Sequence, residues 1–426
     1  MVSIKPKISL RSTFLGLSSF QLLAMFRRGM FYTFLSIYMR DFLLLSVTET
    51  TLYATLPMLM SVIFQNFVWG PLSDRFQKRR TFIILGEILA GVGTILVWFV
   101  HSIVSNLLMA GYVIIIGLMC IEAFWSMSNI SWSALISDIY PSKDRSKVMG
   151  QLTSVGGFGR IIGISIGGIL YNSGYGFRDG PLFIVAALVM FVSSIPMIFT
   201  PEGGIKDIRK IEIGNNENTS QNFNYKTIFI VFIISLTFIN FGRNSIATIY
   251  SQYLILDYPG FAVDSILLSY IANTRSVAVL TIGFLAGTLS KKFGHARTLL
   301  LGVSLSIFAL LITGLTDNLT MIFVGSFFMG TGEVIIYAAS YVIASNLIPS
   351  KIRAKLFGVY NTTFFLSWGL AGTFISGPLI DFLLINGLEE VISYQAAFIV
   401  GALITGIGLV IFLILEIMLK PRSAEK

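Results

Sequence analysis

Cysteine and histidine are almost absent from this chain of 426 residues. It has one cysteine, Cys120, and two histidines, His101 and His295, which lie far apart in the sequence. A single cysteine cannot form an intrachain disulfide, and this set of residues offers neither a metal-binding cluster nor a Cys/His catalytic pair. The sequence therefore predicts no metal, no cofactor and no enzymatic activity.

Charged residues are scarce as well. They make up 12% of the chain, whereas soluble domains contain about a quarter. Hydrophobic residues make up 55%, and the mean hydropathy is +0.81. These values exclude a soluble globular protein.

The sequence is instead rich in long apolar segments. A helix needs about 20 apolar residues to cross a bilayer, and twelve segments qualify, approximately at 14–39, 50–72, 81–101, 106–136, 147–172, 181–200, 226–256, 264–289, 298–316, 319–347, 356–385 and 391–417. The first is too long for the core of a signal peptide and lacks a small-residue cleavage site, so we expect a retained helix. The fold class predicted is an all-α integral membrane protein, and its short loops leave no room for a soluble signalling domain.

The net charge of +9 has a topological explanation that needs no nucleic-acid partner. If both termini are cytoplasmic, the termini and inward loops hold twenty-three Lys or Arg residues, and the outward loops hold only Arg40 and Arg178. This asymmetry follows the positive-inside rule. We therefore expect a multi-pass protein of the plasma membrane with both termini in the cytoplasm.

The chain reads as two related halves. Residues 201–225 form the longest polar stretch, which predicts a cytoplasmic linker between an N-terminal half, 1–200, and a C-terminal half, 226–426. Pro141-Ser142-Lys143 recurs as Pro349-Ser350-Lys351, and Phe26 and Arg28 recur as Phe241 and Arg243. Many secondary transporters are built from such repeats, with the substrate site where the repeats meet.

A glycine-containing basic turn, residues 70–80 (GPLSDRFQKRR), separates two apolar segments, and a blurred copy follows at 287–297. It resembles the motif G-x-L-x-D-R-x-G-R-(K/R)-(K/R) in the loop between helices 2 and 3 of the major facilitator superfamily. Gln77 replaces the second glycine, and the copy has Lys291 in place of the aspartate. The resemblance covers nearly the whole chain and implies twelve helices in two pseudo-symmetric halves, a monomer, and a small-molecule substrate.

The same resemblance implies a conformational switch. In the family, the aspartate of this motif latches the two halves together while the site is open outward, and Asp74 occupies its position. Gly70 and Arg75 belong to the motif, and Asp138 and Arg145 flank the next cytoplasmic turn, so we include them in the predicted switch. The alternative for the basic residues is that they only satisfy the positive-inside rule.

Charges within the membrane segments are costly, at about 2.5–3.5 kcal/mol each on insertion scales. Neighbours on a helix point about 100° apart, so Arg27 and Arg28 cannot both face one cavity. We assign Arg28 to the cavity because Arg243 repeats it, and expect Arg27 to pair with a polar neighbour or to snorkel. Further candidates for substrate binding or proton coupling are Glu122, Glu333, Arg160 and Arg275.

Two interpretations of these charges remain open. In the family, helices 1, 4, 7 and 10 line the central cavity, and Arg28, Glu122, Arg243 and Glu333 fall on those helices. They could form two buried ion pairs that only fix helix packing. They could also form a polar site whose carboxylates take up protons, because desolvation favours the neutral form.

The fifth apolar segment contains glycines at the spacing of the family's antiporter motif, G-x8-G-x3-G-P-x2-G-G, with Ile164 in place of proline. The glycines are Gly150, Gly159, Gly163, Gly167 and Gly168. In the family this motif accompanies exporters that exchange substrate for protons. The alternative is a face of small residues for helix packing.

The sequence thus predicts a secondary transporter that works by alternating access. The function favoured is proton-coupled export, as an antiporter, of a small amphipathic or anionic compound. The alternatives are proton-coupled uptake of an organic anion and flipping of a lipid-linked headgroup. A channel is disfavoured, since a twofold repeat with charges at mid-membrane suits alternating access better.

Overall fold

A computed structural model describes residues 10–140, 142–203, 224–348 and 353–419. Within these ranges the ordered elements are helices and no strand occurs, so the predicted all-α fold is confirmed. The linker residues 204–223 and most of the second basic turn, 349–352, lie outside the described residues.

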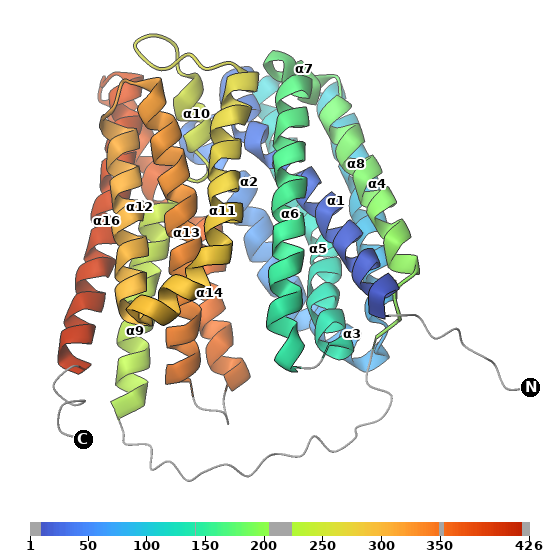
Figure 1. The fold of residues 1–426 in the computed structure, drawn as a ribbon. Helices are drawn as coiled ribbons and strands as arrows, with labels where there is room; N and C mark the ends of the chain where they lie inside the picture. Colours follow the sequence, from blue (N-terminus) through green and yellow to red (C-terminus); the bar gives the residue numbers. More distant parts are fainter. Residues whose placement is uncertain (1–9, 141, 204–223, 349–352, 420–426) are drawn as a thin grey trace, which may run out of the picture. The chain divides into compact units, whose positions relative to one another are not determined.

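The first part of the chain forms the helices shown in blue to green in Figure 1. In chain order they are α1 (Leu10–Ile37), η1 (Tyr38–Phe42), α2 (Val47–Phe64), η2 (Gln65–Trp69), α3 (Gly70–Phe76), α4 (Arg79–Ile103), α5 (Leu107–Ile139), α6 (Ser142–Tyr171), η3 (Asn172–Gly174), α7 (Tyr175–Arg178) and α8 (Pro181–Ile198). The π-helix η2 joins α2 to α3 without a break, so residues 47–76 form one continuous helical span.

The second part repeats this pattern, in yellow-green to red in Figure 1. Its elements are α9 (Asn224–Asn244), α10 (Tyr250–Ile255), α11 (Ser265–Phe293), α12 (His295–Leu315), α13 (Leu319–Leu347), α14 (Arg353–Ala371), η5 (Gly372–Ser376), α15 (Gly377–Ile385) and α16 (Glu390–Leu419). Here the π-helix η5 joins α14 to α15.

Eleven helical spans in the described residues are long and apolar enough to cross a membrane. The helix α1 has 28 residues, about 42 Å at 1.5 Å per residue, which also exceeds the hydrocarbon thickness. It carries Arg11, Arg27 and Arg28, which lower its hydropathy. With α1 as the twelfth, the described spans agree with the twelve predicted.

The chain divides into two compact units. Unit 1 consists of Met1–Leu44 and Leu56–Gly214, and unit 2 of Leu45–Thr55 and Asn215–Lys426. The predicted halves differ from these units in one place, since the beginning of α2 belongs to unit 2 while the rest belongs to unit 1.

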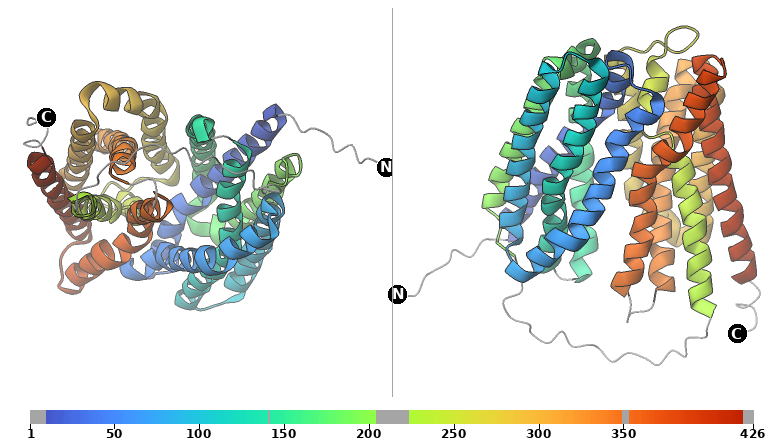
Figure 2. Two further views of the ribbon diagram at one scale, coloured as in Figure 1. Left: turned by 90° about the horizontal axis from the view of Figure 1, so that it is seen from below. Right: turned by 180° about the vertical axis from the view of Figure 1, so that it is seen from behind.

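Each unit is a bundle of long helices that run side by side, as the views in Figure 2 show. In unit 1, α1 packs against α6 and α8, and α4 packs against α5 and α8. In unit 2, α12 packs against α13 and α16, and α9 packs against α14 and α16. The apolar core of unit 2 includes the fully buried side chains of Phe232, Leu236 and Tyr360.

Candidate functional site

The glycines of α6 fix the position of α1, which carries two of the candidate arginines. A Cβ added at Gly159 or Gly163 would collide with the carbonyl oxygen of Leu22 or Phe26, and one at Gly167 would lie 2.6 Å from the oxygen of Met30. In the other direction, a Cβ at Gly29 would lie 2.6 Å from the oxygen of Arg160. The two backbones therefore touch, as small residues permit in membranes. These glycines are thus a packing face, whether or not they also mark an antiporter.

Another glycine of the predicted motif, Gly150, contributes no such contact, since a Cβ there would meet nothing within 4 Å. Gly168 follows the contact glycine Gly167 on the same helix.

Both arginines of α1 lie over one aromatic ring. The guanidinium carbons of Arg27 and Arg28 are 4.0 and 4.6 Å from the ring centroid of Trp125 on α5. The indole Nε1 of Trp125 donates a 2.9 Å hydrogen bond to Oε1 of Glu87 on α4, and Ser128 Oγ donates to the same oxygen at 2.8 Å. Glu87 is 1% exposed, so its buried charge is balanced by these donors and by the arginines beyond the ring.

Arg27 is buried more completely than the sequence suggested. Its side chain is 3% exposed, and its Nε and Nη2 have no hydrogen-bond partner among the described residues. The expectation that Arg27 pairs with a polar neighbour or snorkels was therefore wrong. Nε and Nη2 are the two donors with which a guanidinium binds one carboxylate or phosphate in bidentate fashion. Arg28 is half-buried beside it.

Glu122 lies one helical turn from Trp125 on α5, and it is 8% exposed. Its carboxylate forms a side-chain hydrogen bond with Ser61 on α2, and Ser61 Oγ also accepts a 2.8 Å bond from Gln65. In the described part of unit 1 no arginine forms an ion pair with Glu122. The hydroxyl of Ser61 can serve as partner to the ionised and to the protonated form of the carboxyl group.

Unit 2 holds its own charged group. Arg275 Nη2 on α11 and Glu333 Oε2 on α13 form an ion pair at 2.6 Å, and Arg275 Nε lies 3.2 Å from the same oxygen. Arg243 on α9 donates from Nε to Oδ1 of Asn240 at 3.1 Å. Arg243 and Arg275 line a common cavity of about 10 Å³, which is room for about one water molecule.

The ion pair of unit 2 differs from the grouping on helices 1, 4, 7 and 10 that the resemblance implies. Glu333 pairs with Arg275, which lies outside that group of helices, and not with Arg243. Arg160 is exposed on α6. Of the four charges on those helices, Glu333 forms an ion pair, which is only partly buried, and no ion pair within the described part of unit 1 includes Arg28 or Glu122.

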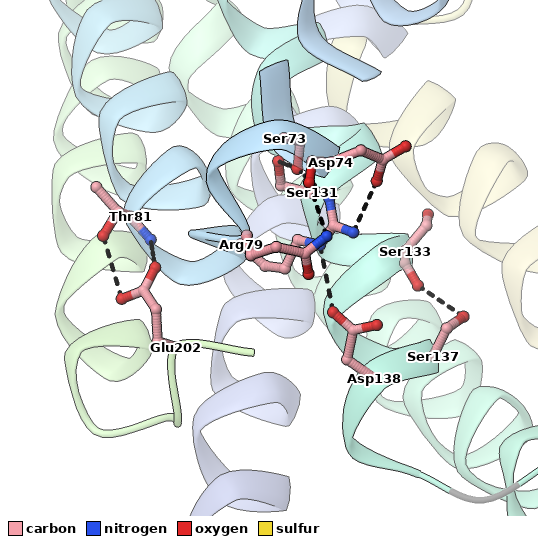
Figure 3. A network of polar contacts seen from close by, with 10 residues as sticks. Ser73, Asp74, Arg79, Thr81, Ser131, Ser133, Ser137, Asp138 and Glu202 are labelled. Carbon is pink, nitrogen blue, oxygen red and sulfur yellow. Dashed lines mark hydrogen bonds and ion pairs between the residues drawn. The ribbon is translucent and has the colours of Figure 1, made fainter. Parts of the chain in front are cut away.

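The loop motif forms a network around Arg79, shown in Figure 3. Arg79 is 6% exposed and its guanidinium binds Asp74 Oδ1 at 2.8 Å, Asp138 Oδ2 at 3.2 Å and Ser73 Oγ at 2.6 Å. Asp74 is largely exposed and Asp138 is largely buried, with side-chain exposures of 74% and 12%. Two of the predicted switch residues, Asp74 and Asp138, thus share one cation.

The remaining switch residues have simpler surroundings. Gly70 begins α3 close to the carbonyl of Gln65, and Arg75 is exposed near the ring of Phe76. Gln77 ends α3 with φ 54° and ψ 33°, the left-handed conformation that glycine adopts most easily, which explains the family's preference for glycine there. The side chain of Arg145 lies outside the described residues.

Three residues of these clusters were missed or undervalued at the sequence level. Glu87 and Trp125 are not among the candidate residues given by the sequence, and Arg79 is one base among four in the basic turn 70–80. The available signal was that Glu87 is an acid inside an apolar helix, where an isolated charge requires a partner. No sequence signal distinguishes Arg79 from Lys78 or Arg80.

Comparison with known proteins agrees with the fold. A family model described as Major Facilitator Superfamily matches residues 17–252 and 232–426. The chain is 26% identical over 305 residues to the multidrug resistance protein MdtG of Proteus mirabilis (strain HI4320), covering 71% of this chain and 72% of that protein. It is 22% identical over 347 residues to MdtG of Enterobacter lignolyticus (strain SCF1), covering 81% and 77%.

Solved structures share the fold at low identity. The nucleoside transporter NupG superposes with a TM-score of 0.71 at 12% identity, over 95% of this chain and 98% of that one. A bacterial homolog of the human lysosomal transporter Spinster, in an inward-facing and unoccupied conformation, gives a TM-score of 0.69 at 16% identity, over 95% and 96%. With its membrane-length helices and the match of the family model across nearly its whole length, the chain is a multi-pass plasma-membrane protein and a transporter that belongs to the major facilitator superfamily.

Proposed function

We propose that this protein exports small amphipathic or anionic compounds in exchange for protons, by alternating access. The observation that carries the proposal is that each compact unit holds its own group of charged side chains on membrane helices, Arg27, Arg28 and Glu122 in unit 1 and Arg243, Arg275 and Glu333 in unit 2. The direction of transport is supported by the relatives, which are multidrug resistance proteins.

In this proposal the arginines recognise the substrate and the two glutamates carry protons. Protonation of Glu333 would remove the charge that holds Arg275 at 2.6 Å and free its guanidinium for another anion. Glu122 forms no ion pair in the described part of unit 1, so it can take a proton without breaking a direct contact with an arginine. The group around Arg79, with Asp74 and Asp138, acts as the switch.

Growth assays test the proposal in a bacterial host that lacks its own drug exporters. Cells expressing the protein are grown with ethidium, benzoate or salicylate, and with the neutral amides of the two acids, at pH 5.5 and 7.5. We expect resistance to some of these compounds, and its loss in Glu122→Gln and Glu333→Gln. The exposed Asp257→Asn is the matched control. Resistance that survives both glutamine substitutions contradicts proton coupling through these residues.

Uptake of an organic anion is the second candidate, and the free donor edge of Arg27 favours it as much as export of an anion. The two functions differ in direction. Cells that accumulate labelled benzoate faster when the protein is expressed favour uptake, whereas cells that retain less of it favour export.

A further inference from the structure

The sequence Gly-Pro-Leu-x-Asp occurs twice in the chain, at residues 70–74 and 377–381. Each copy follows a five-residue π-helix, η2 or η5, and each begins a new helix, α3 or α15, with proline in its first turn. The first copy supplies Asp74 to the network around Arg79. The second supplies Asp381 on α15.

Asp381 binds the free backbone donors at the beginning of α2. Its Oδ1 accepts from Val47 N at 2.9 Å and its Oδ2 from Thr48 N at 2.8 Å. The other donors of this turn are satisfied locally, since Glu49 Oε2 accepts from Ser46 N and Ser46 Oγ accepts from Glu49 N, as in a capping box. The first turn of α2 is therefore fully hydrogen-bonded only with Asp381 in place.

Close packing at glycine accompanies these bonds. A Cβ added at Gly377 would lie 2.8 Å from Cα of Thr48, and one at Gly372 would lie 3.3 Å from the Cγ2 methyl of Thr51. The Thr373 hydroxyl lies 2.6 Å from the hydroxyls of both Thr51 and Thr55. Two turns of α2 thus rest on the backbone and hydroxyls of η5 and α15, a contact that only small residues permit.

The contact with η5 and α15 ends at the boundary between unit 2 and unit 1, which falls inside α2. Residues up to Thr55 belong to unit 2 and those from Leu56 belong to unit 1. Pro57 lies two residues beyond Thr55, inside the helix. A proline removes one backbone hydrogen bond and kinks a helix at low additional cost. The helix can therefore bend close to the boundary between unit 2 and unit 1 at Thr55.

We propose that Asp381 and Gly377 dock the beginning of α2 onto unit 2, and that this docking is released and re-formed in each transport cycle. Asp381 is then a positioning residue for transport, at the N-terminal end of the helical span 47–76 whose other end carries Asp74. The proposal rests on the alternating-access function proposed above.

Labelling of one cysteine tests the docking without any substrate. In purified protein with Cys120→Ser, Thr55→Cys places a thiol where the native side chain is 4% exposed. We expect a water-soluble maleimide to react slowly with it, and about two- to fivefold faster after Asp381→Asn, which weakens an ionic contact to a helix N-terminus. Gly377→Ala, which pushes against Thr48, is expected to act in the same direction, and Asp381→Glu to restore part of the protection.

Two controls separate release from general loosening. Asp264→Asn removes a carboxylate that caps α11 through Leu267 N, and Gly358→Ala adds a methyl on α14 where nothing lies within 4 Å. Neither is expected to change the labelling rate. The proposal is overturned if Asp381→Asn and Gly377→Ala react with the maleimide at the same rate as the parent and the two controls. It is also overturned if the two controls raise the labelling rate as much as Asp381→Asn and Gly377→Ala do.

A reversible cross-link tests the need for release during transport. Thr51→Cys with Thr373→Cys, whose native hydroxyls lie 2.6 Å apart, is expected, again with Cys120→Ser, to form a disulfide that stops drug resistance in cells until a reductant is added. Full activity of the cross-linked protein refutes the proposed release. Absence of resistance in cells with the unlinked parent refutes the proposed export instead, while the labelling result keeps its meaning.

Discussion

The charged groups of the two units satisfy their arginines in opposite ways. In unit 2, Arg275 has a carboxylate at 2.6 Å and Arg243 has an amide oxygen at 3.1 Å. In unit 1, Arg27 and Arg28 lie over the ring of Trp125, and two donors of the buried Arg27 have no partner in the described residues.

Under the proposed function, this difference separates an arginine that a carboxylate holds until it is protonated from an arginine whose donors await an acceptor. A buried donor without an acceptor costs about 1–3 kcal/mol, so a fold keeps one where another molecule supplies the acceptor or where function opposes stability. In unit 1, the ring of Trp125 offsets part of this cost for Arg27, since a cation over an indole ring retains part of its stabilisation.

The acid beneath Trp125 is expected to give the largest effect on stability. Glu87→Leu leaves the N–H of Trp125 and the hydroxyl of Ser128 without their shared acceptor, so we expect a loss of about 2–5 kcal/mol in unfolding free energy. Denaturant unfolding of the purified protein measures it. Glu87→Gln keeps one acceptor and should lose less; an equal loss in both variants would mean that the charge, and not the hydrogen bonds, matters.

The ion pair of unit 2 comes next. Arg275→Met removes the ion-pair partner of Glu333 in a partly buried position, and we expect a loss of about 1.5–3 kcal/mol in unfolding free energy. Removing both charges in Arg275→Met with Glu333→Met should restore part of this loss, because a hydrophobic pair often replaces an ion pair without cost. A double variant as unstable as the sum of the single variants would show that the two residues are not coupled.

Arg27 is expected to contrast with Arg275. Because its Nε and Nη2 have no partners, Arg27→Met should change unfolding free energy by no more than about 1 kcal/mol in either direction, while it abolishes resistance to acidic compounds. The same unfolding assay gives the first number and the growth assay the second. A loss as large as that in Arg275→Met would remove the distinction between the two units.

The exposed end of the Arg79 network is expected to show the smallest effect. Asp74 is 74% exposed and its bond to Arg79 is open to solvent, so Asp74→Asn should lose no more than about 1 kcal/mol. Asp138→Asn, at 12% exposure, should lose more. If Asp74→Asn nevertheless stops transport, its importance lies in switching and not in the stability of this conformation.

The membrane helices and the twofold repeat followed directly from the sequence. Apolar length is a local property, and the repeats of Arg28 as Arg243 and of Pro141 as Pro349 are visible in the printed chain. The pairing of charges was predicted less well. Glu333 pairs with Arg275, and Arg27 lies over Trp125. The partner of a side chain depends on the rotation of each helix about its axis, and counting residues gives that rotation only to within a turn.

The sequence alone determined that this chain crosses the membrane with long apolar helices, since the cost of polar groups in a bilayer leaves few folds for such a composition, and its loop motif carried the resemblance to a transporter family. Only the tertiary structure decided which charges pair, which remain without partners, and that the beginning of α2 is bonded to Asp381, more than 300 positions away in the chain. Those contacts depend on close approach of backbones at glycines such as Gly163 and Gly377, and such an approach is a property of two packed helices, not of either segment by itself.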